Sequence, residues 1–146
     1  ITPHLGEMSR LCGKSIDSIK KDSVNIAREF ATKFRVILVL KDARTIIAYP
    51  NGEVYINLTG NSALSVAGSG DILTGIISSQ FSLGLSIEDA ARMGVFIHGL
   101  CGDLIRESIG QDGVMAEDIL NNLPKTLKYY RDNFDEIIGK YSIKTV

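Results

Sequence analysis

A short run of small residues, from Val66 to Asp71, carries the most distinctive chemistry in this sequence. Gly68, Ser69 and Gly70 precede Asp71, and apolar side chains follow at helical spacing. We therefore expect a loop at the start of a helix, where glycines allow close approach and the first backbone N–H groups have no helical partner. Such a terminus binds phosphate or another anion, and the carboxylate beside it can accept a proton from a hydroxyl that attacks the phosphate.

A plainer interpretation of the same run is a connecting loop in which Asp71 is the N-cap of the helix. Short glycine motifs of this kind arise often by chance. The run alone therefore leaves both interpretations open, and the rest of the chain has to decide between them.

Composition indicates one ordinary globular domain. The sequence has 146 residues, of which 45% are hydrophobic and 23% charged, and its formal net charge is −1. This charge gives no electrostatic case for nucleic acid or an anionic membrane as a partner, and no apolar run approaches the roughly 20 residues that span a bilayer. Cys12 and Cys101 lack C-x-x-C spacing, so we expect a reduced, cytoplasmic protein without disulfides.

Helical and strand patterns alternate along the chain and predict an α/β fold. The run from Val36 to Leu40 is apolar at every position, which is typical of a strand in the middle of a sheet with helices on both faces. The polar turn that follows, from Lys41 to Thr45, would lie at the edge of the sheet where α/β proteins bind ligands. A hairpin is expected next, with strands over 45–49 and 53–58 around a turn at 50–52.

Helices are expected on either side of these strands. Ser86 resembles a capping residue, and Gly84 and Gly110 are typical helix ends. The stretch from Phe134 to Val146 is amphipathic and fits either a helix or an arm used in assembly. The other expected helices cover 5–11, 18–33, the segment from the glycine run to Gly84, 86–108, 116–122 and, with Pro124 at its start, a last segment to about 132.

Two polar residues lie inside the apolar helix expected over 86–108. His98 has no partner at metal-ligand spacing, so we expect a core histidine and no protein-held metal. Asp103 is expected to make a polar contact at the helix surface or between helices.

Five segments, in this order, resemble the ADP/ATP-dependent NAD(P)H-hydrate dehydratase family: 2–8, 39–45, 59–61, 67–77 and 91–103. That family has a three-layer α/β/α ribokinase-like fold, which is longer than this chain. The resemblance therefore implies that residues 1–146 are the carboxyl-terminal portion of one such domain. We expect a fragment, completed by a missing amino-terminal half or by another chain, because the sheet edge beside 36–40 cannot be left bare.

The resemblance also implies roles for individual residues. Family members use ADP or ATP to phosphorylate the hydroxyl of hydrated NADH or NADPH; phosphate then leaves and the reduced cofactor is restored. Asp71 matches the catalytic aspartate at the substrate, and His4 matches a histidine that contacts the hydrated dinucleotide. Mg²⁺ would arrive on the nucleotide phosphates, and a homo-oligomer is expected. The positions that match nucleotide contacts are Lys41, Asp42, Ala43, Arg44, Thr45, Asn61, Gly68, Ser69 and Gly70.

One of these positions departs from the family pattern. Asp42 stands where the family usually has glycine, which places a carboxylate near the expected phosphates.

Two other functions remain open. A ribokinase-like kinase of a small alcohol, such as hydroxymethylpyrimidine, would use the same Asp71, although such kinases usually carry Asn in place of His4. A non-catalytic assembly module would show no turnover and no stabilisation by nucleotide.

Overall fold

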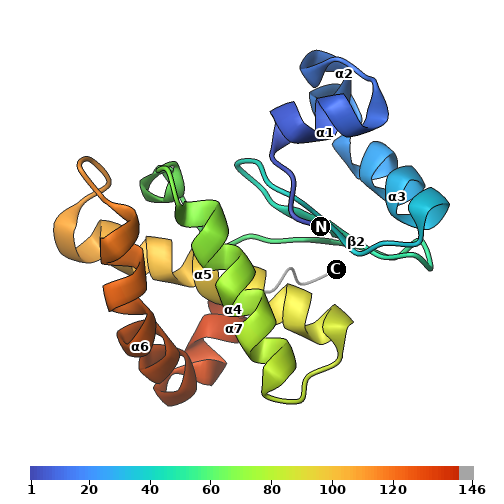
Figure 1. The fold of residues 1–146 in the computed structure, drawn as a ribbon. Coiled ribbons are helices and arrows are strands. Elements are labelled where there is room, and N and C mark those ends of the chain that lie inside the picture. The colour runs from blue at the N-terminus through green and yellow to red at the C-terminus, as the bar shows by residue number, and fades with distance from the viewer. Residues whose placement is uncertain (142–146) are drawn as a thin grey trace.

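The computed structural model describes residues 1–141, which form helices around one small sheet (Figure 1). The strands are β1 (Leu38–Leu40), β2 (Ile46–Ala48) and β3 (Val54–Ile56). The helices are α1 (Leu5–Cys12), α2 (Ile16–Lys21), α3 (Ser23–Phe34), the short 3₁₀ helix η1 (Ser62–Leu64), α4 (Ser69–Ser82), α5 (Ile87–Ile109), α6 (Ala116–Asp132) and α7 (Phe134–Tyr141).

The three strands are antiparallel, with β2 between β1 and β3. Val39 lies opposite Ile47, and Ile47 lies opposite Tyr55. The predicted hairpin is confirmed, although each strand is shorter than expected. The first residues of the chain lie along the other edge of β1 and run parallel to that strand. The amide of Lys41 donates to the carbonyl of Pro3 at 2.8 Å, which ties the two segments together.

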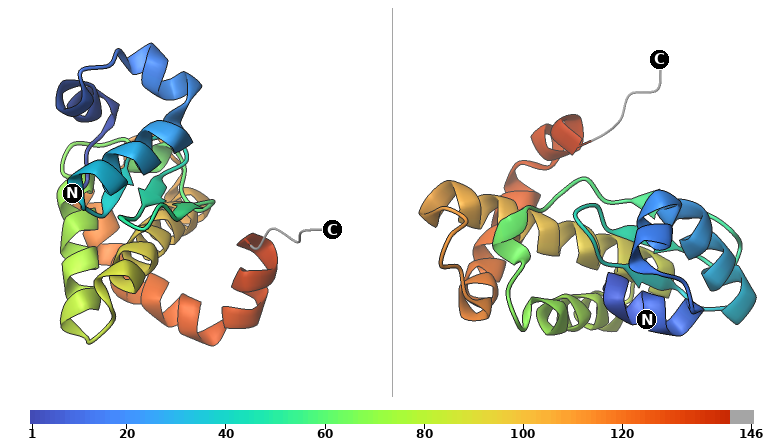
Figure 2. Two further views of the ribbon diagram at one scale, coloured as in Figure 1. Left: turned by 90° about the vertical axis from the view of Figure 1, so that its right-hand side faces the viewer. Right: turned by 90° about the horizontal axis from the view of Figure 1, so that it is seen from above.

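Helices cover both faces of this sheet (Figure 2). Leu38 and Leu40 pack with α1, α2 and α3 in one core cluster. Val39 packs with Leu73 of α4 and Val95 of α5 on the opposite face. Successive strand side chains point to opposite faces, so a strand that is apolar at every position needs a layer on each side. The prediction of helices on both faces is therefore confirmed.

Helix α5 packs closely against its neighbours because three of its residues lack a side chain. A Cβ atom on Gly94 would lie 2.5 Å from Ile77 Cγ1, and one on Gly102 would lie 2.6 Å from Leu64 Cγ. A Cβ atom on Gly99 would lie only 2.1 Å from the Thr59 hydroxyl. Helix α4, η1 and the loop before η1 therefore lie directly against the backbone of α5.

Some helix boundaries differ from the sequence predictions. The single helix expected over 18–33 is wrong, because Asp22 leaves the helical region (φ −143°, ψ 44°) and separates α2 from α3. Two helices expected around Pro124 are one helix, α6, which accommodates the proline in its interior. The predicted start at Ser86 and end at Gly110 are confirmed for α5. The amphipathic stretch begins as α7, and its last five residues lie outside the described part. None of the described helices is long and apolar enough to cross a membrane.

Candidate functional site

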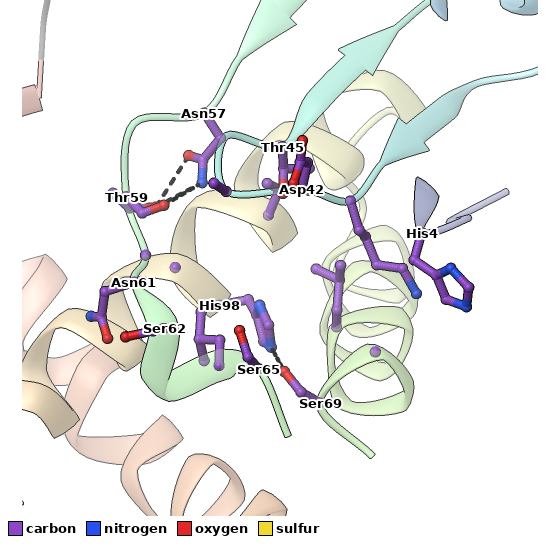
Figure 3. A pocket seen from close by; sticks show the side chains of 18 of the residues that line it. His4, Asp42, Thr45, Asn57, Thr59, Asn61, Ser62, Ser65, Ser69 and His98 are labelled. Atoms are coloured by element: carbon purple, nitrogen blue, oxygen red, sulfur yellow. Dashed lines mark hydrogen bonds between the residues drawn. The ribbon is translucent and has the colours of Figure 1, made fainter. Parts of the chain in front are cut away.

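A cleft of about 540 Å³ opens where the carboxyl end of β1 meets the first turn of α4 (Figure 3). Its walls come from His4, the turn after β1, the loop from Asn57 to Val66, and residues of α4 and α5. This is the edge of the sheet at which the sequence predicts ligand binding, and the volume is typical of a small-molecule site.

The glycine run forms the loop and helix start that the sequence predicts. Gly68 is the N-cap of α4, with a left-handed backbone (φ 88°) that favours glycine. Asp71 is the third residue of α4, so the interpretation of Asp71 as N-cap is wrong. No side chain caps this terminus. The amides of Ser69 and Asp71 donate to the carbonyls of Val66 and Gly68 at 3.2 and 3.1 Å, so among the described residues the Gly70 amide is the first-turn donor left available to a ligand.

Lys41 adds positive charge at the same place. Its ammonium lies against Gly70, where an added Cβ atom would be 2.9 Å from Nζ. A helix N-terminus is itself partly positive, so the two features repel each other unless an anion lies between them. No salt bridge involves Lys41 within residues 1–141. The start of α4 and Lys41 together therefore form a place at Gly70 that could hold an anion.

His98 of α5 is buried beside the start of α4 and contacts Ser69. Their Nε2 and Oγ atoms are 3.1 Å apart (Figure 3). Burial lowers the pKa of His98 to about 4, so the imidazole is neutral at pH 7. The expectation of a core histidine is confirmed, but this histidine also lines the cleft. The sequence signal that His98 lines the cleft was its position in the fifth family-like segment, 91–103.

The loop from Asn57 to Asn61 is held by hydrogen bonds to itself and to α5. The Thr59 hydroxyl donates to the carbonyl of Phe96 at 3.0 Å, and the Asn57 amide donates to Thr59 Oγ1 at 2.9 Å. The Asn61 amide donates to Asp103 at 2.9 Å, while its oxygen accepts from the amide of Ala63. Asn61 therefore lines the cleft with both polar atoms of its side chain already hydrogen-bonded.

His4 caps α1 at the edge of the cleft. Its Nδ1 atom accepts from the amides of Gly6 and Glu7 at 3.0 and 3.2 Å. The His4 amide donates to the Glu7 carboxylate at 2.7 Å and lowers the pKa of that carboxyl. These bonds fix the orientation of the ring and leave Nε2, 3.5 Å from Glu7 Oε1, as its other polar atom.

The structure brings most of the predicted site residues to the cleft. Arg44, Gly68 and Asp71 do not line it. The Arg44 guanidinium instead donates to the carbonyl of Leu58 at 3.0 Å. Asp71 is exposed on α4 directly after Gly70. The predicted residues that do line the cleft are His4, Lys41, Asp42, Ala43, Thr45, Asn61, Ser69 and Gly70.

The lining residues that were not predicted as site residues include Asn57, Thr59 and Gly60. Thr59 and Gly60 belong to the third family-like segment, which was the available signal. Asn57 is placed by the hairpin that precedes the loop, so its role depends on tertiary structure. Within the described residues, no group of three or more His, Cys, Asp or Glu side chains is arranged to hold a metal ion.

Comparisons with known proteins agree with this geometry. A sequence model described as NAD(P)H-hydrate dehydratase matches residues 1–125. The chain is 48% identical over its whole length to the bifunctional NAD(P)H-hydrate repair enzyme Nnr of Thermofilum pendens, and covers 28% of that protein.

Solved structures give the same result. One is the ADP/ATP-dependent NAD(P)H-hydrate dehydratase of Bacillus subtilis co-crystallised with ATP/Mg²⁺, with a TM-score of 0.86 and 32% identity over 88% of this chain and 47% of that one. A ribokinase-like superfamily protein of Enterococcus faecalis has a TM-score of 0.75 and 30% identity over 88% of this chain and 43% of that one. The chain thus has a ribokinase-like fold and spans less than half the length of these relatives.

Proposed function

The chain belongs to the NAD(P)H-hydrate dehydratase family, and we propose that it carries the phosphoryl-transfer end of an enzyme that dehydrates hydrated NADH or NADPH. The observation that carries this proposal is the positive charge gathered at Gly70, where the uncapped start of α4 meets the ammonium of Lys41. Asp71 follows Gly70 directly, so a proton acceptor stands beside the group that holds phosphate.

The proposed reaction begins with the transfer of a phosphoryl group to the hydroxyl of the hydrated ring. Lys41 and the Gly70 amide at the start of α4 bind the oxygens of the phosphoryl group and stabilise the charge that they carry during transfer. Asp71 accepts the hydroxyl proton as the hydroxyl oxygen attacks phosphorus and the bond to the nucleotide breaks.

The second step needs less from the protein. The lone pair of the ring nitrogen expels phosphate with cleavage of the carbon–oxygen bond. A proton then leaves the neighbouring ring carbon, and the double bond of the reduced nicotinamide is restored. The sum is loss of water from the hydrate, coupled to conversion of the nucleotide and water to the shorter nucleotide and phosphate.

The phosphoryl donor in this proposal is ADP or ATP with Mg²⁺. The donors that line the cleft include one lysine, backbone amides, and hydroxyl and amide side chains, which suit phosphate oxygens. Mg²⁺ would be held mainly by the phosphates and would neutralise part of their charge. The Bacillus subtilis relative, crystallised with ATP/Mg²⁺, supports this assignment.

The remaining expectations stay predictions for the whole protein. These are that residues 1–146 form the carboxyl-terminal portion of a three-layer α/β/α domain, that an amino-terminal half completes the domain, that the protein is cytoplasmic, and that it assembles as a homo-oligomer. The match to less than half of each solved relative supports the first two.

The proposal is tested with the full-length protein and hydrated NADH. Mg²⁺ and either ADP or ATP are added, and the return of reduced-nicotinamide absorbance is followed together with phosphate release. We expect absorbance and phosphate to rise in equal amounts and only with nucleotide present. Phosphorylation of a small alcohol without any return of absorbance would instead identify a kinase.

A further inference from the structure

Asp103 of α5 makes three hydrogen bonds behind the cleft, although it does not line the cleft itself. Its Oδ2 atom accepts from the amide of Gly60 at 3.0 Å and from the hydroxyl of Tyr141 at 2.9 Å. Its Oδ1 atom accepts from the side-chain amide of Asn61 at 2.9 Å. The carboxylate thus connects the loop that lines the cleft to α5 and α7.

Both loop residues depend on this carboxylate for their placement. Gly60 has a left-handed backbone (φ 99°) and lies on Gly99, since a Cβ atom on Gly60 would be 3.3 Å from Gly99 Cα. Asn61 uses its oxygen to cap η1 through the amide of Ala63 at 2.9 Å. Only the amide nitrogen of Asn61 is left to face α5, and Asp103 is the acceptor that it meets.

The third donor comes from the last described helix. Burial raises the pKa of Tyr141, and the Asp103 carboxylate raises it further, so the phenol keeps its proton at neutral pH and remains a donor. No salt bridge neutralises Asp103 within residues 1–141. All of its described partners are neutral donors, which fix the direction of the carboxylate.

We propose that Asp103 is a positioning residue for the nucleotide end of the cleft, acting through Gly60 and Asn61, and that Tyr141 of α7 orients its carboxylate. This inference rests on the proposed function, because it assigns nucleotide binding to the cleft. Asp103 itself touches neither substrate. It fixes the wall against which the nucleotide binds, and so sets nucleotide affinity more than the rate of the chemical step.

The substitution Asp103→Asn tests this with little change in shape. An amide can accept at only one of its two positions, so its NH₂ group would face a donor of the loop or of Tyr141. We expect the Kd for ADP with Mg²⁺, measured by titration calorimetry on the full-length protein, to rise about tenfold. The KM for ADP should rise in parallel, while kcat at saturating ADP stays within about twofold of wild type.

Two further variants separate positioning from loss of stability. Tyr141→Phe removes one donor and should raise the Kd for ADP about threefold in the same direction. Thr126→Val removes a buried hydrogen bond from α6, where the Thr126 hydroxyl donates to the Asn122 carbonyl at 3.0 Å, away from the cleft. Thr126→Val and Asp103→Asn should both lower the Tm, but Thr126→Val should leave the Kd for ADP unchanged.

The outcomes are distinct. An unchanged Kd in Asp103→Asn and in Tyr141→Phe, with ADP binding to wild type, overturns the positioning role and leaves the proposed function standing. An equal rise in Kd for Thr126→Val overturns it as well, because the effect would then be one of general stability. A wild-type protein that binds no ADP overturns the proposed function and this inference together.

Discussion

The polar groups around the cleft fall into two regions that differ in how they are used within the fold. Side chains of the first region, called here the unbonded side, make no hydrogen bond or salt bridge to any described residue. Those of the second, the bonded side, are tied to one another or to α5. The unbonded side includes the charged residues Lys41, Asp42 and Asp71, and the bonded side includes Asn57, Thr59, Asn61, Ser69 and His98.

This difference separates the two tasks of a binding site. The unbonded side contributes little to folding, so its charges are available to interact with a ligand. The bonded side fixes the shape of the cleft, because the bonds from Thr59 and Asn61 to α5 would be lost if the loop moved away from that helix. Substitutions on the unbonded side should therefore change binding or turnover, and substitutions on the bonded side should change stability.

The largest effect is expected for Asp71→Asn, which keeps the shape of the side chain and removes the proton acceptor. We expect kcat to fall about a thousandfold. The Tm should be unchanged, because the Asp71 side chain bonds to nothing in the described part of the protein. Steady-state kinetics and thermal unfolding of the same preparation check both statements. A large fall in Tm would place Asp71 on the bonded side.

The next largest effect is a loss of stability at low pH, which comes from His98 on the bonded side. Because burial lowers the pKa of His98 to about 4 from an unfolded value of 6.5, the unfolded chain takes up a proton at a higher pH than the folded one. The stabilisation is complete above pH 6.5 and is lost as the pH falls from 6.5 through 4, with a total on the order of 3 kcal/mol.

Urea unfolding between pH 7 and pH 4 measures this loss. His98→Asn should lose less stability over the same interval than the wild type does. Parallel curves for the two proteins would show that His98 titrates normally and does not contribute in this way.

Gly99→Ala tests the close contact between α5 and the loop. The added Cβ atom would lie 2.1 Å from the Thr59 hydroxyl, so the loop has to shift, and we expect a loss of about 2 kcal/mol in the free energy of unfolding. Gly75→Ala in α4 is the matched control, since nothing lies within 4 Å of its added Cβ. It should stabilise the protein by up to about 1 kcal/mol. Equal changes in the two variants would contradict the packing argument.

The smallest effect is expected for Asp42→Asn. The Asp42 carboxylate lines the cleft that contains the proposed anion site, and it should oppose phosphate binding through charge repulsion across solvent. Removing the charge should tighten ADP binding about threefold at low salt and less at high salt. Weaker binding would show instead that Asp42 holds Mg²⁺ or a hydroxyl of the nucleotide.

The local sequence pattern predicted those elements that are determined by residues close together in the chain. The apolar run ending at Leu40 predicted a sheet with helices on both faces, and Ser86 and Gly110 predicted the ends of α5. The glycine run predicted a loop that leads into a helix, although the helix begins at Ser69, two residues before the expected junction at Asp71. Each of these follows from residue types within a few positions of one another.

Other features depend on contacts that no local pattern contains. The bond from the Gly60 amide to Asp103 joins residues 43 positions apart, and the capping of α1 by His4 uses a residue type that is not a usual cap. Pro124 sits inside α6, which local rules disfavour. The bonded side was therefore missed for the most part, whereas most of the unbonded side was found from motif and resemblance.

The central claim is that Lys41 and the start of α4 bind phosphate, and Lys41→Met tests it most directly. ADP and adenosine are each titrated into the wild type and the variant in the presence of Mg²⁺. We predict that the variant binds ADP about tenfold more weakly and binds adenosine as the wild type does, with the same Tm. Equal weakening of both ligands, or of neither, would contradict the assignment of Lys41 and the start of α4 as the phosphate site.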